Sequence, residues 1–358
     1  MRILYSETTA YYPSSAHFLE ALERRAARGE DEFRFLDEAK FIPSAISLAD
    51  RIAGRVMGHP RRGYRELNRA LVEQATTFSP DLVLIGKGSC FTASTLRAVK
   101  AATGAMLVNW ATDDPFNSAD SSHDLLESIP VYDLYVCTKR AIVPDVIATG
   151  CAHAAYVRFG YKPDVHFPEP PATDEERSRF ACDVMFAGGC DDDRAPYFTA
   201  LVSGLPGVAL NLYGGYWERV RELRPYARGF AVGRDYRLAV GAAKIAVNLC
   251  RRSNRDDHVM RTFEIPACGG FMLAERSATH SELFAEDVDA AFFGTPDEFV
   301  AKVKSYLARD TDRERIAAAG RQAIVNGKHS YDDRLREILA CAKALKNHPA
   351  SASAAVAR

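Results

Sequence analysis

The residues with the clearest chemical potential are the arginines of a polar loop in the second half of the chain. Arg251, Arg252 and Arg255 follow a short apolar run, Ile245–Leu249, that is typical of a buried strand. A predicted helix begins at Val259, directly after this loop. Guanidinium groups bind phosphate oxygens in pairs, and a helix N-terminus favours an anion, so the pattern indicates a diphosphate site. The alternative is a solvated charged loop without a ligand.

A second loop of this kind follows the predicted strand Asp183–Ala187. Gly188 and Gly189 have no side chain, so the backbone there can approach a phosphate closely, and Arg194 adds a positive charge. The run Asp191–Asp193 has two interpretations, because three carboxylates could hold a divalent cation against a diphosphate or could cap the following helix. We favour the capping role and predict no metal site.

The first half offers three ionisable side chains that could remove a proton from a hydroxyl group. His17 follows the first predicted strand, and Asp113 and Asp114 follow another strand at Ala105–Trp110. The alternative for His17 is a packed histidine at a helix start. For Asp114, which precedes Pro115, the alternative is an aspartate that forms a turn. The sequence does not separate these interpretations.

A glycine-flanked lysine in the first half invites comparison with a phosphate-binding loop. Lys87 lies in Gly86-Lys87-Gly88-Ser89, but no glycine stands five residues before Gly86 and the residue after Lys87 is not a hydroxyl residue. We therefore predict a turn at a strand end, with Lys87 facing the ligand cleft.

These side chains need a scaffold, and 358 residues are enough for two domains. Short apolar runs alternate with stretches of helical period, which indicates an α/β fold of parallel strands joined by crossover helices. We predict two Rossmann-like, doubly wound domains that face a central cleft. Residues 1–160 form the first domain, 161–180 a linker rich in proline and charge, 181–346 the second domain and 347–358 a flexible tail. The last helix, Tyr331–Lys346, is a candidate to pack back on the first domain.

Composition excludes several classes of protein. The 46 Lys and Arg against 47 Asp and Glu give a net charge of −1, which favours neither nucleic acid nor a lipid surface as partner. The eight cysteines are scattered without a C-x-x-C pair, so we expect no disulfide scaffold or structural zinc and place the protein in the cytoplasm. No apolar run approaches the ~18 residues that span a bilayer.

Several stretches resemble the CgeB-like (spore-maturation) branch of the GT-B glycosyltransferases, with a C-terminal domain similar to those of glycosyltransferase families 1 and 4. In the second half they are Asp183–Gly188, Arg261–Gly270 and His329–Arg334. In the first half, Asp81–Gly88 and Asn109–Phe116 resemble the family's acceptor-side domain. The resemblance implies that the C-terminal domain binds a nucleotide-diphosphate sugar of the UDP, GDP or dTDP type. It further implies transfer of the sugar to an acceptor hydroxyl held by the N-terminal domain.

The resemblance also suggests roles for single residues. Glu264 matches the glutamate that GT-B transferases place on the donor ribose, where a carboxylate accepts from two hydroxyl groups. Many retaining relatives carry a second glutamate eight positions earlier, where this chain has the shorter Asp256. The expected donor-binding residues are Gly188, Gly189, Arg194, Arg255, Asp256, Arg261, Glu264, Gly269 and Gly270. On the acceptor side we expect Asp114, His17 and Asp113 as catalytic candidates, with Tyr11, Tyr12, Lys87 and Asn117 around them.

We expect no cofactor besides the nucleotide sugar, and the acceptor, whether glycan, small molecule or protein, stays open. Two alternatives share the same architecture: a sugar-nucleotide epimerase, and a non-catalytic protein that binds a sugar nucleotide. Conversion of a donor to its epimer without an acceptor would favour the first alternative. Tight nucleotide binding without turnover would favour the second.

Overall fold

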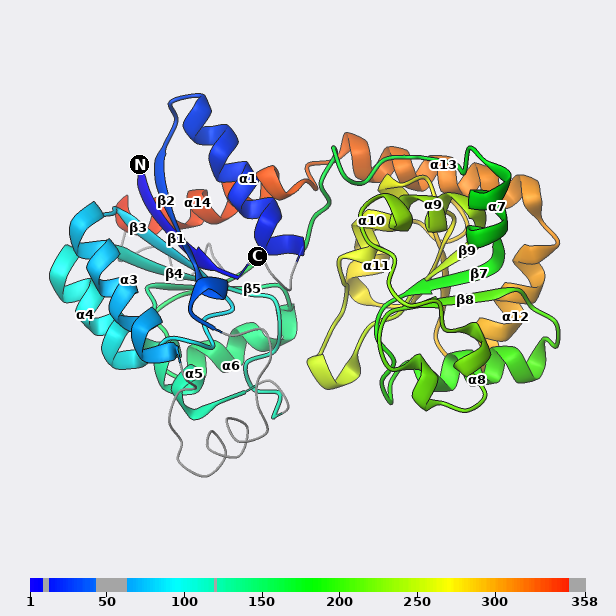
Figure 1. Cartoon of the computed structure of the whole chain (residues 1–358), viewed down its shortest axis with the longest axis horizontal. Helices are drawn as coiled ribbons and strands as arrows, with labels where there is room; N and C mark the ends of the chain where they lie inside the picture. Colours follow the sequence, from blue (N-terminus) through cyan, green and yellow to red (C-terminus); the bar gives the residue numbers. More distant parts are fainter. Residues whose placement is uncertain (9–12, 43–62, 119–120, 348–358) are drawn as a thin grey trace. The chain divides into compact units, whose positions relative to one another are not determined.

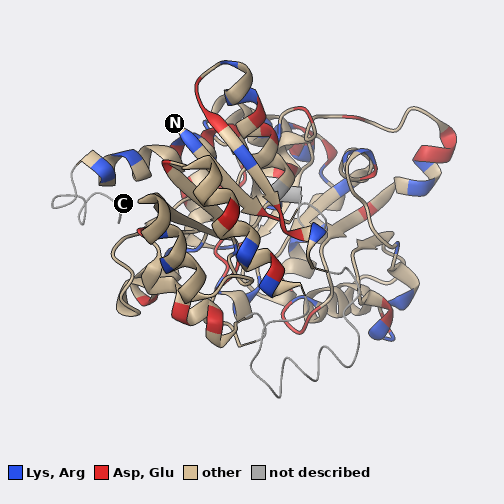
Figure 2. Cartoon of the chain, turned by 60° about the vertical axis from the view of Figure 1, so that its left-hand side comes forward, with Lys and Arg blue, Asp and Glu red and all other residues tan. Residues whose placement is uncertain are grey.

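A computed structural model describes residues 1–8, 13–42, 63–118 and 121–347. The chain divides into two compact units, one of residues 1–158 and 331–358 and one of residues 159–330 (Figure 1). Lys and Arg are interspersed with Asp and Glu along the ribbon of both units (Figure 2), in keeping with the near-zero net charge. Among the described residues, no helix is long and apolar enough to cross a membrane. None of the described cysteines forms a disulfide.

The described part of the first unit holds a six-stranded, entirely parallel sheet in the order β2-β1-β3-β4-β5-β6. Alternate residues of one strand face opposite layers: Leu107 joins the core beneath α3 and α4, whereas Trp110 packs edge-on against Phe18 of α1. The strands are β1 (Arg2–Glu7), β2 (Glu32–Asp37), β3 (Leu82–Gly86), β4 (Met106–Ala111), β5 (Leu134–Cys137) and β6 (Ala154–Tyr156). The helices are α1 (Pro13–Ala27), α3 (Tyr64–Phe78), α4 (Ala93–Thr103), α5 (His123–Ser128), α6 (Val143–Ala148) and α14 (Tyr331–Asn347).

The second unit holds a five-stranded parallel sheet in the order β11-β10-β9-β7-β8. Helices α8 and α12 cover one face, where Phe198 and Phe299 pack against Phe186 and Phe293 of the sheet (Figure 1). The strands are β7 (Cys182–Ala187), β8 (Leu210–Tyr213), β9 (Ala243–Asn248), β10 (Met272–Glu275) and β11 (Ala291–Phe293). The helices are α7 (Asp174–Phe180), α8 (Ala195–Gly204), α9 (Arg234–Ala242), α10 (Arg261–Ala267), α11 (Ala278–Leu283), α12 (Pro296–Leu307) and α13 (Asp310–Asn326).

Both sheets are doubly wound, which confirms the predicted fold class. In the first unit the winding reverses between β1 and β3, and in the second unit it reverses between β7 and β9. Ligands of such sheets bind outside the carboxyl ends of the strands at this reversal. The two loops singled out in the second half follow β7 and β9, so they flank the reversal point of their unit.

The stretch 161–180, expected to be a linker, is integrated into the second unit. Phe180, at the end of α7, and His166 are buried. Arg237 of α9 clamps the stretch, because its guanidinium donates to the carbonyl of Val165 (3.0 Å) and to the carboxylate of Glu169 (2.7 Å). Proline and charged residues correctly indicate a segment with little regular structure. The segment is nevertheless ordered, because side chains far away in the sequence bind it, and local sequence does not reveal such contacts.

Candidate functional site

The glycine loop after β7 is held in place by the chain that follows β8. The indole Nε1 of Trp217 donates to the carbonyl of Gly188 at 2.8 Å, and the Arg194 guanidinium donates to the carbonyl of Gly189 at 3.2 Å. Gly214 has φ +125°, and a Cβ there would come within 2.3 Å of the Gly188 carbonyl oxygen. The glycine backbones of the loops after β7 and β8 thus pack directly against one another at the carboxyl end of the second sheet.

Arg194 stands in a cationic environment at the start of α8. Its Nη1 is 3.3 Å from a carboxylate oxygen of Asp191. Burial, reinforced by the charges of Arg251 and Arg261, lowers the pKa of Arg194, although Asp191 and Asp256 oppose this effect. Arg251 and Arg261 thus lie near Arg194, and each of the three guanidinium groups has a carboxylate at 3.3 to 3.8 Å. Such a group of cations suits an anionic ligand.

Two of the three aspartates before α8, Asp191 and Asp193, have partners within the protein. Asp191 accepts from the backbone N–H of Arg194 at 2.9 Å, as a capping residue does, and Asp193 accepts from the backbone N–H and the hydroxyl of Ser253 at 3.2 Å each. Asp193 therefore ties the loop after β7 to the loop after β9. These contacts give both aspartates a structural task.

Asp256 organises the arginine loop after β9. Its carboxylate accepts from the backbone N–H of Arg251 at 3.1 Å and from the side-chain amide of Asn254 at 2.8 Å. Between them, Arg255 adopts a left-handed backbone with φ 48°. The Asp256 side chain is only 2% exposed, so these hydrogen bonds fix the shape of the loop from within.

Glu264 is buried on α10, at 5% exposure, between two nitrogen-bearing side chains. Its Oε1 is 3.7 Å from Nε2 of His166, and its Oε2 is 3.8 Å from Nε of Arg261. Tyr236 of α9 lies near the same carboxylate. Burial raises the pKa of the tyrosine, and the negative charge of Glu264 raises it further. Both carboxylate oxygens are thus oriented by neighbours from different elements.

A buried polar network fixes α10 to the sheet. His280 of α11 donates from Nδ1 to the carbonyl of Glu275 (2.6 Å), and its Nε2 accepts from the hydroxyl of Thr262 (2.9 Å). Asn248, the last residue of β9, donates to the same hydroxyl at 3.0 Å. Burial lowers the pKa of His280 to about 4, so the ring is neutral at physiological pH. The network holds the helix that carries Glu264 without adding charge.

Gly269 and Gly270 allow close packing at the end of α10. A Cβ at Gly270 would lie 2.4 Å from a methyl group of Val240 in α9. Gly269 has φ +79°, and a Cβ there would approach Pro168 to 3.3 Å. In the structure these predicted site residues bring α10, α9 and the 161–180 stretch together, and their direct part in ligand binding stays a prediction.

In the first unit, Lys87, Asp113 and Asp114 line one small pocket at the carboxyl end of β3 and β4. Nζ of Lys87 is 3.2 Å from Oδ2 of Asp113. Asp114 is 3% exposed, and its Oδ1 accepts from the backbone N–H of Phe116 at 2.9 Å. That hydrogen bond is the one expected of a turn-forming aspartate. The backbone of Asn117 completes the turn by donating to the Asp114 carbonyl at 3.2 Å.

The remaining acceptor-side candidates are placed differently. His17 is 6% exposed and lies on α1, with its ring centroid 5.0 Å from that of Tyr331 in α14. This is the environment of a packed histidine, and His17 does not line the pocket of Asp113 and Asp114. Tyr11 and Tyr12 lie outside the described residues.

Two buried carboxyl groups at the same edge of the first sheet were not among the predicted site residues. Glu7, at the end of β1, lies so close to Gly86 that a Cβ there would be 1.3 Å from Oε2 of Glu7. Glu38 follows β2 and accepts from the hydroxyl of Ser6 at 3.0 Å. Burial raises the pKa of Glu38 to about 7. In sequence both look like ordinary surface glutamates, and only strand order shows that they follow neighbouring strands.

In the second unit, His166 and Tyr236 were not predicted as site residues. Arg251 was named as part of the polar loop but was not among the expected donor-binding residues. Arg251 belongs to the arginine loop, so its signal was present in the sequence. His166 and Tyr236 carry no local signal, because their position depends on how 161–180 and α9 pack.

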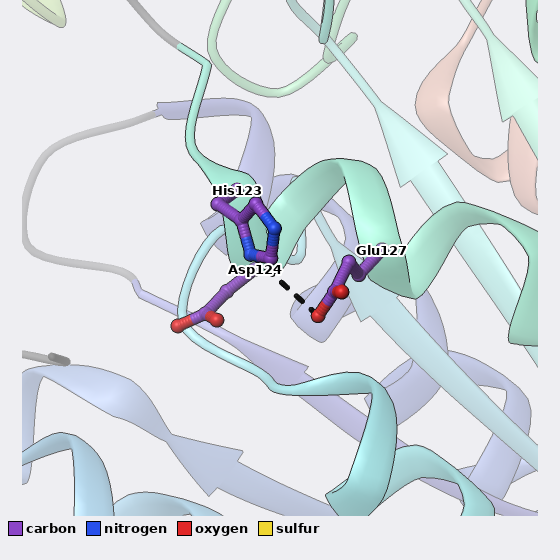
Figure 3. Close-up of side chains that lie close together, drawn as sticks. All are labelled: His123, Asp124 and Glu127. Carbon is purple, nitrogen blue, oxygen red and sulfur yellow. Dashed lines mark ion pairs between the residues drawn. The ribbon is translucent and has the colours of Figure 1, made fainter. Parts of the chain in front are cut away.

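Across the described residues, one group of side chains has metal-ligating atoms within 4.8 Å of one another: His123, Asp124 and Glu127. Figure 3 shows them on the short helix α5 of the first unit, with His123 Nδ1 3.6 Å from Glu127 Oε2. The His123 side chain is 82% exposed and that of Glu127 59%. Exposed groups of this kind are common on helix surfaces, and these residues belong to a different unit from the arginine loop.

Comparisons with known proteins fit this geometry. Residues 194–340 match the family described as glycosyl transferase-like. A search of curated proteins gives no match. The structure is similar to that of HepE from Anabaena in complex with UDP and glucose, with a TM-score of 0.63 and 12% identity over 97% of this chain and 100% of that chain.

The likeness extends to other solved structures over nearly their whole length. Sucrose-phosphate synthase from Thermosynechococcus elongatus gives a TM-score of 0.68 at 12% identity, covering 97% of this chain and 100% of that chain. A glycosyltransferase from Rickettsia africae gives 0.64 at 11% identity, covering 96% and 98%. The chain has the GT-B fold. The family match over residues 194–340 supports glycosyl transfer as the class of reaction.

Proposed function

We propose that this GT-B chain is a CgeB-like glycosyltransferase that moves a sugar from a UDP-, GDP- or dTDP-sugar to an acceptor hydroxyl. The observation that carries the proposal is the grouping of four side chains of the second unit, all within the glycosyl transferase-like match over residues 194–340: Arg194, Arg251, Arg261 and Glu264. The first three supply positive charge and the fourth a buried carboxylate, which are the groups that a nucleoside diphosphate needs. The resemblance of Arg261–Gly270 to the CgeB-like branch supports the finer assignment.

Each group would recognise a different part of the donor. The Glu264 carboxylate accepts hydrogen bonds from the 2′- and 3′-hydroxyl groups of the ribose in UDP or GDP, or from the single 3′-hydroxyl group in dTDP. The guanidinium groups of Arg194, Arg255 and Arg261 hold the diphosphate and stabilise the charge that develops on it as the sugar leaves. In this proposal guanidinium groups do the work of a divalent cation. Structural partners for Asp191 and Asp193 support that view.

On the acceptor side, Asp114 is the proposed general base, with Lys87 and Asp113 beside it. An aspartate removes the proton of the attacking hydroxyl as the new glycosidic bond forms. Burial of Asp114 in the pocket with Lys87 supports this role.

A thermal-shift panel of UDP, GDP, dTDP and CDP tests donor binding. A ligand at about 100 times its dissociation constant stabilises the protein by about 2.7 kcal/mol, so the correct nucleotide raises the melting temperature most. If none of the nucleotides shifts the melting temperature, the proposal fails. The preferred nucleotide then guides a screen of its sugar derivatives.

Incubation of each donor with and without an acceptor panel separates the activities. Sugar transfer that survives excess EDTA supports the proposal. Loss of transfer in EDTA with recovery in magnesium would move attention to Asp191–Asp193. Conversion of the donor to an epimer without acceptor would identify an epimerase, and nucleotide binding without any turnover would identify a binding protein.

A further inference from the structure

A buried histidine stands directly beside the carboxylate proposed to bind ribose. His166 is 7% exposed and belongs to the stretch 161–180. Its Nε2 is 3.7 Å from Oε1 of Glu264, and the Glu264 side chain is 7% exposed. Hydrogen bonds of a binding site are often long until a ligand tightens them.

The local backbone determines which ring nitrogen of His166 carries the proton. The backbone N–H of Lys162 donates to Nδ1 at 3.0 Å, so Nδ1 accepts and the proton of the neutral ring sits on Nε2. The turn is closed in the other direction as well, because the His166 N–H donates to the Lys162 carbonyl at 2.7 Å. Nε2–H therefore faces Glu264 as a donor.

The surroundings of the ring favour its neutral form. Burial lowers the pKa of His166, and the cations Arg261 of α10, Arg237 of α9 and Lys162 of its own segment lower it further, while Glu264 opposes them. Tyr236 of α9, the other titratable group beside the ring, packs edge-on with its centroid at 6.1 Å. At pH 7 the neutral imidazole thus offers its Nε2–H to Glu264. It adds no positive charge that would compete with a ligand for the carboxylate.

A buried hydroxyl group next to this pair points to a ligand. Tyr236 is 5% exposed, yet its hydroxyl oxygen has no hydrogen-bond partner among the described residues. A buried hydroxyl group without a partner is costly, so such atoms in a polar pocket are commonly satisfied by a bound molecule.

We propose that His166 is a positioning residue, which through Nε2–H holds Oε1 of Glu264 in the orientation that accepts from a ribose hydroxyl group. Arg261 faces the other oxygen, so each oxygen keeps a free direction for one hydroxyl of a vicinal diol. The inference rests on the proposed binding of a nucleoside diphosphate. It narrows the proposed donor to a ribonucleotide such as UDP or GDP, because dTDP lacks the 2′-hydroxyl group of a vicinal diol.

Two substitutions separate the two nitrogens of His166. In His166→Asn the amide oxygen takes the place of Nδ1 and keeps the turn with Lys162, but no donor reaches Glu264. In His166→Gln the amide N–H takes the place of Nε2 and keeps the donor. The exposed His123, in the other unit, provides the control His123→Asn. Melting temperatures of all variants report whether the fold is kept.

The measurement is calorimetric binding of UDP and of 2′-deoxy-UDP, or of the matching pair for whichever nucleotide binds best. We expect His166→Asn to weaken UDP binding roughly 3- to 10-fold, the range of one net hydrogen bond, and to reduce the ratio between the two affinities. His166→Gln should recover most of the UDP affinity and most of the ratio between the two affinities. His123→Asn should change neither the affinity nor the ratio. In a Glu264→Gln background, His166→Asn should have no further effect.

Each alternative outcome is distinct. Wild-type affinity and ratio in His166→Asn would overturn the positioning role, as would a full loss that persists in the Glu264→Gln background. Equal damage by Asn and Gln would show that Nε2–H is not the active group. If the wild-type protein binds no nucleotide at all, the proposed function fails, whereas normal nucleotide binding that ignores His166 defeats only this inference.

Discussion

At the scale of single residues, Glu264 makes the sharpest prediction. Glu264→Gln replaces a charged acceptor of two hydroxyl groups by an amide with one acceptor oxygen, so we expect weaker nucleotide binding with the fold intact. The loss should be about 1.5–3 kcal/mol, the range for hydrogen bonds to a charged group. Calorimetry with the preferred nucleotide checks it, with Glu20→Gln in the first unit as control. Unchanged affinity would remove Glu264 from the site.

Asp114 and His17 compete for the role of general base. We expect Asp114→Asn to lower the transfer rate by about 10²–10⁴, the usual contribution of positioned proton transfer, while nucleotide affinity stays unchanged. His17→Ala should affect stability more than rate, because its ring packs on Tyr331. A larger rate loss in His17→Ala would reverse the assignment. If neither variant loses rate, the anomer of the product, determined by NMR, shows whether a retaining mechanism applies.

The raised pKa of the buried Glu38 should make the stability of the first unit depend on pH. Its pKa is about 7 in the folded state because the carboxyl group is buried, against 4.5 for the ordinary group. Between these values the folded protein keeps a proton that the unfolded chain has lost, so the contribution of Glu38 to stability is greatest below pH 4.5 and falls as the pH rises to about 7. The total loss is about 3 kcal/mol.

The variant Glu38→Gln lacks this dependence because its amide is neutral throughout. Its stability relative to the unmutated protein should therefore rise between pH 5 and pH 8 and then level off. Urea unfolding measures this when both proteins also carry Trp217→Phe, which leaves the buried Trp110 as a reporter of the first unit. A difference that is constant with pH would contradict the burial of an ionisable Glu38.

At the scale of elements, sequence predicted what depends on local pattern. Apolar runs predicted a strand at Asp183–Ala187, observed as β7 (Cys182–Ala187), and a strand at Ala105–Trp110, observed as β4 (Met106–Ala111). Short elements such as α7 and β11 were missed, because three to seven residues carry too little periodicity. The stretch 161–180 was assigned to a linker for a different reason. Its order comes from Arg237, 68 residues beyond Glu169, and no local pattern encodes that contact.

The junction of α9 and α10 tests this dependence on long-range packing. Gly270→Ala places a methyl group 2.4 Å from Val240 and 3.3 Å from Ile265, so one helix must shift. We expect a loss of about 1–3 kcal/mol in unfolding free energy, typical of overpacking. Val240→Ala in the same protein should restore part of it, since the colliding methyl group is gone. Absence of rescue, measured by urea unfolding with a double-mutant cycle, would locate the strain elsewhere.

At the scale of the whole molecule, the C-terminal segment of the chain belongs to the first unit rather than to the second unit that it follows in sequence. Helices α13 and α14 are separated by only four residues, yet α13 belongs to the second unit and α14 packs with α1 in the first. Arg24 of α1 and Asp332 of α14 form a bidentate ion pair with distances of 3.1 and 2.5 Å. The sequence predicted the last helix, Tyr331–Lys346, as a candidate to pack back on the first domain, and contacts such as this pair hold α14 in the first unit.

This division yields a prediction about where a bound nucleotide stabilises the chain. The proposed donor residues all lie in the second unit, and a ligand stabilises only those openings that break its own site. Saturating nucleotide should therefore slow amide hydrogen exchange in β7, β9, α10 and α13. The effect should end before Tyr331, with α14 and β1 unchanged. Mass spectrometry of peptides on either side of Ser330 measures this. Equal protection in α14 would mean that nucleotide binding also engages the first unit, and that the donor site is not confined to residues 159–330.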